Sequence, residues 1–113
     1  MGYILHNAIV VTAWQEEAAR ALADYAAEIG AEALIGKPQI NGYITVCITP
    51  DGSKEGWSNS DDGDSRRNQI VTWLGAHPGW YFEWCEVAYG SDDATAEVTR
   101  DAWSSHHPRR TGE

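Results

Sequence analysis

The predicted fold depends most on residues 43–64, Tyr43-Ile-Thr-Val-Cys-Ile-Thr-Pro-Asp-Gly-Ser-Lys-Glu-Gly-Trp-Ser-Asn-Ser-Asp-Asp-Gly-Asp64. Side chains alternate in the first part of this segment, which predicts a half-buried strand over about residues 40–49. Its apolar face consists of Ile44, Val46 and Ile48. A strand of this kind needs a second layer over its apolar face, so helices elsewhere in the chain must cover it.

A turn and an acidic stretch follow the strand. Pro50-Asp-Gly-Ser53 suits a tight turn, because Pro presets φ at one central position and Gly accepts a positive φ. We expect residues 54–57 to return as a short, charged edge strand. Ser58-Asn-Ser-Asp-Asp-Gly-Asp64 is then expected to be a solvated loop that caps the next helix.

Upstream of this segment, the pattern predicts a strand and a helix. Residues 3–13 are rich in β-branched residues and apolar on both faces, which is typical of a central strand. Residues 14–29 switch to a helical period, and Gly30 suits the position after a helix end. The helix is expected to resume for one turn at residues 33–35 before Pro38 ends it.

Downstream, a second helix and an aromatic strand are expected. Residues 65–75 form the helix, with Asp62 or Asp64 as its N-cap. Its inner face is expected to consist of Ile70, Trp73 and Leu74. Residues 80–89 form a strand that is apolar on both faces. Residues 91–113 are expected to be a short helical or irregular tail.

These elements give the order β-α-β-β-α-β in a single α+β domain, residues 1–90. The predicted architecture is a two-layer sandwich, a four-stranded, mostly antiparallel sheet with two helices packed on one face. The tail or a second copy of the chain must cover the other face. Six Trp and five Tyr among 113 residues exceed what a core of this size requires, so we expect a homodimer.

The overall charge limits the classes of partner. A formal net charge of −9 at pH 7 repels phosphate backbones, so we expect no direct nucleic-acid binding and favour a basic surface on another protein. The apolar stretches are shorter than the roughly 18–20 residues of a membrane span, and no Lys or Arg precedes Arg20. We therefore expect no membrane association and a cytoplasmic location.

The thiols and imidazoles form no recognisable catalytic pattern. Cys85 could pair with His6 or His77, but it lies in an apolar strand without a neighbouring cation. We expect both Cys85 and Cys47 to be buried structural thiols.

The carboxylates also lack a catalytic or metal-binding pattern. Glu83 and Glu86 fall on opposite faces of their predicted strand, which argues against a paired-carboxylate site. The acidic stretch of residues 58–64 lacks the bidentate glutamate of a calcium loop. We predict no metal, no cofactor and no catalytic residue.

Aromatic and arginine residues are the candidate binding groups, because exposed Trp and Tyr beside Arg can form a protein interface or stack a flat ring. Contact with a partner protein is assigned to the predicted hairpin and the loop beside it: Trp57, Asp61, Asp62, Asp64, Arg66 and Arg67. If the ligand is a nucleotide, stacking and clamping are assigned instead to Phe82, Trp84, Arg100 and Arg109.

Several motifs in residues 6–90 resemble a family of small proteins encoded by tailed bacteriophages and prophages. The motifs are Asn41-Gly-Tyr43, Pro50-Asp-Gly-Ser-Lys-Glu-Gly-Trp57, Ser60-Asp-Asp-Gly-Asp64 leading to Arg67, Trp73-Leu74 and Trp84-Cys-Glu-Val-Ala-Tyr-Gly90. An opening strand like His6-Asn-Ala-Ile-Val-Val-Thr12, followed by an amphipathic helix, is also similar. The resemblance implies a phage accessory protein that acts inside an infected bacterium, and it carries over no functional residue.

These features predict a binding protein that counters a bacterial defence system by sequestration or occlusion, without catalysis. The expected partner is a host defence protein, bound through an acidic and aromatic surface. Two alternatives remain open. One is a sponge that sequesters a nucleotide immune signal, and the other is a small hydrolase.

Overall fold

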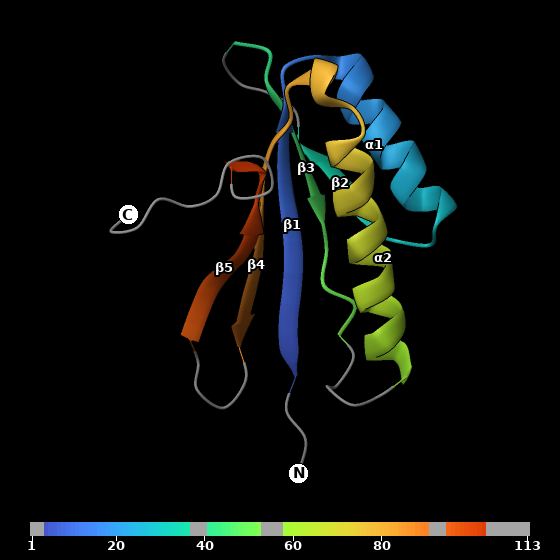
Figure 1. The fold of residues 1–113 in the computed structure, drawn as a ribbon, viewed down its shortest axis with the longest axis vertical. Coiled ribbons are helices and arrows are strands. Elements are labelled where there is room, and N and C mark those ends of the chain that lie inside the picture. The colour runs from blue at the N-terminus through green and yellow to red at the C-terminus, as the bar shows by residue number, and fades with distance from the viewer. Residues whose placement is uncertain (1–3, 37–40, 53–57, 91–94, 104–113) are drawn as a thin grey trace.

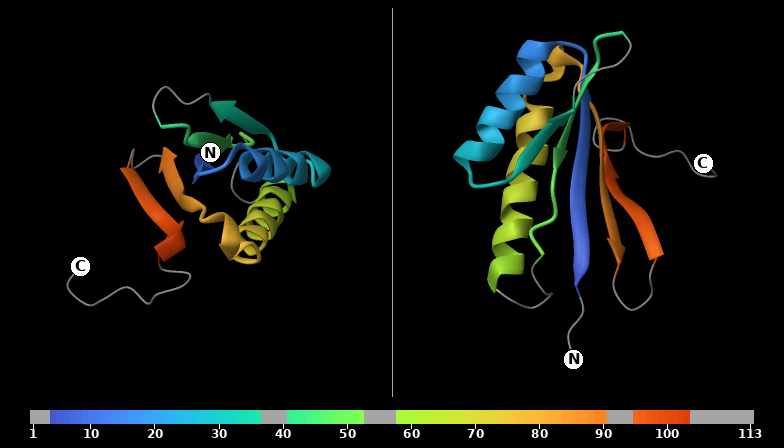
Figure 2. Two further views of the ribbon diagram at one scale, coloured as in Figure 1. Left: turned by 90° about the horizontal axis from the view of Figure 1, so that it is seen from above. Right: turned by 180° about the vertical axis from the view of Figure 1, so that it is seen from behind.

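The computed structural model describes residues 4–36, 41–52, 58–90 and 95–103, which form a five-stranded sheet with two helices on one face (Figures 1 and 2). In chain order the elements are β1 (Leu5–Ala13), α1 (Glu16–Glu28), β2 (Ala33–Gly36), β3 (Ile44–Ile48), α2 (Ser58–Gly75), the 3-10 turn η1 (Pro78–Trp80), β4 (Glu83–Gly90) and β5 (Thr95–Asp101). The predicted α+β class is confirmed, with five strands in place of four.

The sheet has the order β2-β3-β1-β4-β5, and every pair of neighbours is antiparallel. β1 is therefore the central strand, as its two apolar faces predict. The order β1-α1-β2-β3-α2-β4 is that of a split β-α-β, or ferredoxin-like, arrangement, to which β5 adds an edge.

The core lies between the sheet and the helices. Alternate residues of the central strands point into it, including Ile9 and Val11 of β1 and Val46 of β3, and all three are fully buried. α1 contributes Leu22, and α2 contributes Ile70, as predicted for its inner face. Both helices are therefore fixed on the sheet by an apolar stripe.

The prediction that the first helix resumes at residues 33–35 is wrong. Ile29 and Gly30 end α1, with Gly30 at φ +87°, and residues 33–36 form β2 instead. β2 pairs with β3 from Ala33 opposite Ile48 to Gly36 opposite Thr45. Backbone hydrogen bonds with β3 stabilise residues 33–36 as a strand, and they outweigh the local helical preference of these few residues. The predicted returning strand, residues 54–57, lies outside the described residues.

The acidic stretch is not a loop. α2 begins at Ser58 instead of residue 65, so the predicted N-caps Asp62 and Asp64 lie within the helix. Carboxylates in the first turns of a helix interact favourably with its dipole, which explains why an acidic sequence is helical here.

The aromatic strand begins later than predicted. Trp80 belongs to η1, and Tyr81 adopts a left-handed conformation with φ +56°, so β4 starts at Glu83. The prediction of a short helical or irregular tail is wrong for residues 95–101. These residues form β5, which pairs with β4 at the edge of the sheet. Thr and Val residues suit this strand once a neighbour is available to pair with it.

Candidate functional site

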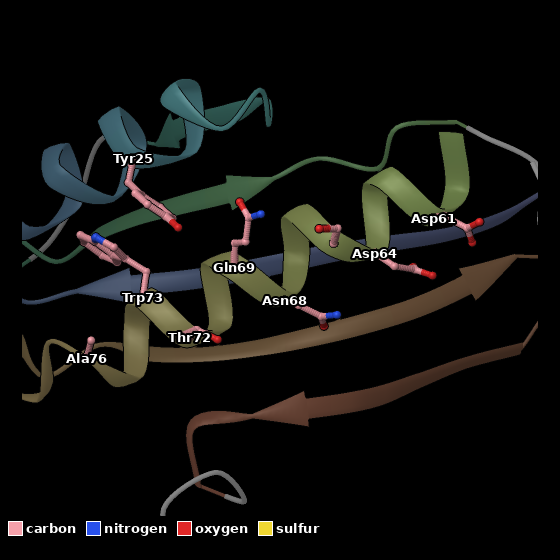
Figure 3. A pocket seen from close by; sticks show the side chains of 9 residues that line it. Tyr25, Asp61, Asp64, Asn68, Gln69, Thr72, Trp73 and Ala76 are labelled. Atoms are coloured by element: carbon pink, nitrogen blue, oxygen red, sulfur yellow. The ribbon is translucent and has the colours of Figure 1, made fainter. Parts of the chain in front are cut away.

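The outer face of α2 carries a shallow hollow of about 620 Å³ (Figure 3). Asp61 and Asp64 lie at one end of it, and Trp73 of α2 with Tyr25 of α1 lies at the other end. Asn68 and further polar side chains line the stretch between them. The lining residues recur every three or four positions along α2, so they form one stripe on the side of the helix that faces away from the core.

The aromatic end of the hollow is built by two stacked rings. The rings of Tyr25 and Trp73 have centroids 5.5 Å apart and planes inclined by 16°. Trp73 also contacts the rings of His77, Trp80 and Phe82, at centroid distances of 4.2, 6.0 and 5.6 Å. These neighbours hold the Trp73 ring in place, so it offers a partner a rigid aromatic surface.

Asp61 and Asp64 form the acidic end of the hollow, and Asp62 is their neighbour in the sequence of α2. Asp61, Asp62 and Asp64 are all exposed. Among the residues that the structure describes, neither Asp61 nor Asp62 forms an ion pair. Because both carboxylates are exposed, a basic group of another molecule can approach them.

The two arginines that follow these carboxylates face other groups. Arg66 lies with its Nη2 3.9 Å from Asp51 Oδ2 in the segment after β3. Arg67 is buried and pairs with Asp64 and with Glu86 of β4. Neither guanidinium forms an ion pair with Asp61 or Asp62.

A buried charge network lies beneath this face and joins α2 to the sheet. Glu86 is 5% exposed, and its carboxylate accepts hydrogen bonds from Arg100 Nε at 2.6 Å and Nη2 at 2.9 Å, and from Thr99 Oγ1 at 2.9 Å. Arg67 Nε lies 3.4 Å from the same carboxylate. Arg100 Nη1 also donates to Asn68 Oδ1 at 2.9 Å, which connects β5 to the centre of the hollow.

The network keeps Glu86 ionised. Burial by itself would raise the pKa of the Glu86 carboxyl, but hydrogen bonds from Arg100 and Thr99 and the charges of Arg100 and Arg67 lower the pKa below its ordinary value of 4.5. The hydrogen bond with Glu86 likewise raises the pKa of Arg100. A carboxylate with a lowered pKa and occupied oxygens is a poor general base, so the network serves to position α2.

The predicted protein-contact residues separate into two groups. Asp61, Asp62 and Asp64 lie together at the exposed end of α2, whereas Arg66 and Arg67 are turned toward other groups. The structure joins the acidic group to an aromatic pair that was not predicted. Trp57 lies outside the described residues.

The predicted nucleotide-contact residues do not form one open pocket. Trp84 is 8% exposed and belongs to the core, Phe82 is held in the aromatic cluster around Trp73, and Arg100 binds Glu86. Arg109 lies outside the described residues. Trp84 therefore has no open ring face on which a base could stack.

Sequence patterns did not assign Glu86, Tyr25, Asn68 or Trp73 to the site. Glu86 lies between Trp84 and Ala88 on the buried face of β4, and a charged residue at such a position is a signal that a buried partner exists. Tyr25 and Asn68 gave no signal, because their role depends on how α1, α2 and β5 meet.

The thiols are placed differently from the prediction. Cys47 and Cys85 are free and half-buried on β3 and β4, and both face Val10 of β1. Glu83 and Glu86 do lie on opposite faces of β4, as predicted, with Glu83 exposed and accepting a hydrogen bond from Trp14 Nε1 at 3.1 Å.

No group of three His, Cys, Asp or Glu residues in the described ranges is arranged to hold a metal ion. Neither of the described α-helices is long and apolar enough to cross a membrane. Comparisons with protein-family models, with curated proteins and with solved structures find no match to this chain.

Proposed function

We propose that the protein acts by binding a basic surface of another protein with the outer face of α2, without turnover. The observation that carries the proposal is the hollow along α2, in which the exposed carboxylates of Asp61 and Asp64 lie at one end and Trp73, stacked on Tyr25 of α1, lies at the other. Charged groups steer and orient a partner, and a fixed aromatic ring supplies the buried contact.

The geometry of α2 sets the spacing of the partner's contact groups. Asp61 and Trp73 are twelve residues apart, which corresponds to about 18 Å along a helix at about 1.5 Å per residue. The partner should therefore present a basic group for Asp61 and Asp62 and, about 18 Å away, a basic or apolar side chain that covers Trp73 and Tyr25.

The resemblance to tailed-phage accessory proteins supports a bacterial defence protein as this partner and the host cytoplasm as the compartment. In this proposal the phage protein occupies the basic face that the defence protein needs for its own nucleic acid or substrate. A negatively charged surface competes effectively for such a face.

Affinity capture from host lysate tests the proposal with charge-matched variants. The test variant is Asp61→Asn/Asp62→Asn, and the control is Glu17→Gln/Glu28→Gln, which removes two exposed charges from α1. Asp64 is left unchanged because it pairs with Arg67. We expect the wild type and the control to retain the same host protein, and the test variant to bind it about 2- to 30-fold more weakly at low salt.

Three further results decide the proposal. Gln69→Lys places a positive charge inside the hollow and should weaken capture, whereas Ala27→Lys, an exposed site on α1, should not. Equal capture by every variant contradicts the assignment of the surface. A mass increment of nucleotide size in native mass spectrometry after incubation with a host metabolite extract, without a captured protein, would instead support the sponge alternative.

A further inference from the structure

No described helix or strand covers the face of the sheet opposite α1 and α2 (Figure 2). Strand register places Leu34, Cys47, Val10 and Cys85 in one row across β2, β3, β1 and β4. A second row contains Ala8, Val87 and Val98. We call this surface the open face.

Three aromatic residues extend the open face at one end. The ring of Trp14 contacts those of Tyr43 and Tyr81, each at a centroid distance of 5.8 Å. Trp14 also donates to Glu83, which register places on the open face opposite Thr12. Tyr89 lies at the other end beside His6, with ring centroids 5.1 Å apart.

We infer that the open face is the interface through which two copies of the chain form a dimer. This inference goes beyond the proposed function, which uses the opposite side of the molecule. Two observations favour a second copy over a different partner. They are the area of the face and the distribution of charge.

The exposed apolar area is close to what a stable dimer requires. The exposed side chains on this face are Val10, Trp14, Leu34, Tyr43, Tyr81, Tyr89 and Val98. Their exposed fractions, applied to side chains that expose about 150–250 Å² when free, correspond to about 700 Å². A standard interface buries about 800 Å² per partner, so the face is large enough once its less exposed neighbours are included.

Few charged side chains of the described residues lie on the open face. The arginines lie on the helices or, in the case of Arg100, turn toward Glu86. Register places two carboxylates on the open face, those of Glu83 and Asp101. In a two-fold contact the same surface meets itself, so two chains of net charge −9 can associate best through the face with the fewest carboxylates.

The two thiols provide an internal probe of this interface. Cys47 and Cys85 flank Val10 from both neighbouring strands, so they are about 10 Å apart at a strand spacing of about 4.8 Å. This distance is too long for a disulfide within one chain. In a face-to-face dimer both thiols become shielded, so they should react with a maleimide more slowly as the protein concentration rises.

Sedimentation equilibrium of the wild type and three lysine variants tests the inference. Val10→Lys should raise the dimer Kd at least about 100-fold, because a two-fold contact would bury two unpaired ammonium groups. Leu34→Lys and Ile35→Lys form a matched pair on β2, since these neighbours are 57% and 46% exposed on opposite faces. Leu34→Lys should raise the Kd about 10-fold, whereas Ile35→Lys should leave it unchanged.

Two results would overturn the inferred dimer interface. A wild-type monomer at about 100 µM overturns the inference and leaves the face to another partner. A wild-type dimer that Val10→Lys and Leu34→Lys do not weaken also overturns it. Circular dichroism shows whether each variant is folded. If Val10→Lys on the central strand does not fold, Leu34→Lys on the edge strand β2 still tests the interface.

Discussion

Replacing Glu86 with Gln should destabilise the protein because it removes the buried negative charge that Arg100, Thr99 and Arg67 share. Glu86→Gln keeps the size of the side chain but leaves Arg100 against a neutral amide, while Arg67 keeps its ion pair with Asp64. Removing one partner of a fully buried pair costs about 3–5 kcal/mol. The Arg100 side chain is 36% exposed and keeps part of its solvation, so we expect a loss of about 2–3 kcal/mol.

Thermal and urea unfolding followed by circular dichroism measure this loss. For a chain of this length, 2–3 kcal/mol corresponds to a decrease in Tm of about 8–12 °C. The control is Glu83→Gln, on the same strand and on the opposite, exposed side, which keeps an oxygen for Trp14 Nε1 and should change stability by less than about 0.5 kcal/mol. If Glu86→Gln unfolds within about 0.5 kcal/mol of the wild type, the network does not hold α2 on the sheet as described.

Two more predictions follow from the same elements. The lowered pKa of Glu86 means that its contribution to stability is complete above the ordinary pKa of 4.5 and is lost as the pH falls through the lowered value. The difference in unfolding free energy between wild type and Glu86→Gln should therefore shrink as the pH falls below 4.5, and a difference independent of pH would contradict this. Gly75 lies near the end of α2 with open space around it, so Gly75→Ala should stabilise the protein by up to about 1 kcal/mol. Gly63→Ala should not stabilise it, because a Cβ at Gly63 would collide with the Asp51 carboxylate. Equal changes in urea unfolding for both glycine variants would show that the contact of Asp51 with α2 is unimportant.

The parts of the fold that follow from local pattern were predictable. α1 and β3 each have a clear period, and β1 is recognisable from its apolar, β-branched residues. Helical spacing also predicts Ile70 and Leu74 on the inner face of α2, but Trp73, predicted on the same face, is only partly buried and lines the hollow. The two short edge strands were missed or assigned as helix, because residues 33–36 and 95–101 become strands through pairing with β3 and β4. Pairing between segments distant in sequence is not visible in one sequence.

The acidic stretch shows why the candidate site was predictable only in part. Asp61, Asp62 and Asp64 were identified as an exposed contact surface, but their composition predicted a loop. Gly63 strengthened that prediction, although its role in the structure is to let Asp51 pack closely against α2. The aromatic half of the site depends on Tyr25 meeting Trp73 across two helices, which local spacing does not encode.

Carboxylate footprinting of the captured complex tests the central claim most directly. Carbodiimide coupling labels exposed carboxyl groups, and the protein alone should be labelled at Asp61 and Asp62 on α2 and at Glu17 and Glu28 on α1. With the host partner bound, we predict that labelling of Asp61 and Asp62 decreases while labelling of Glu17 and Glu28 is unchanged. Unchanged labelling of Asp61 and Asp62 in a complex that is fully formed would contradict the claim that the outer face of α2 is the binding surface.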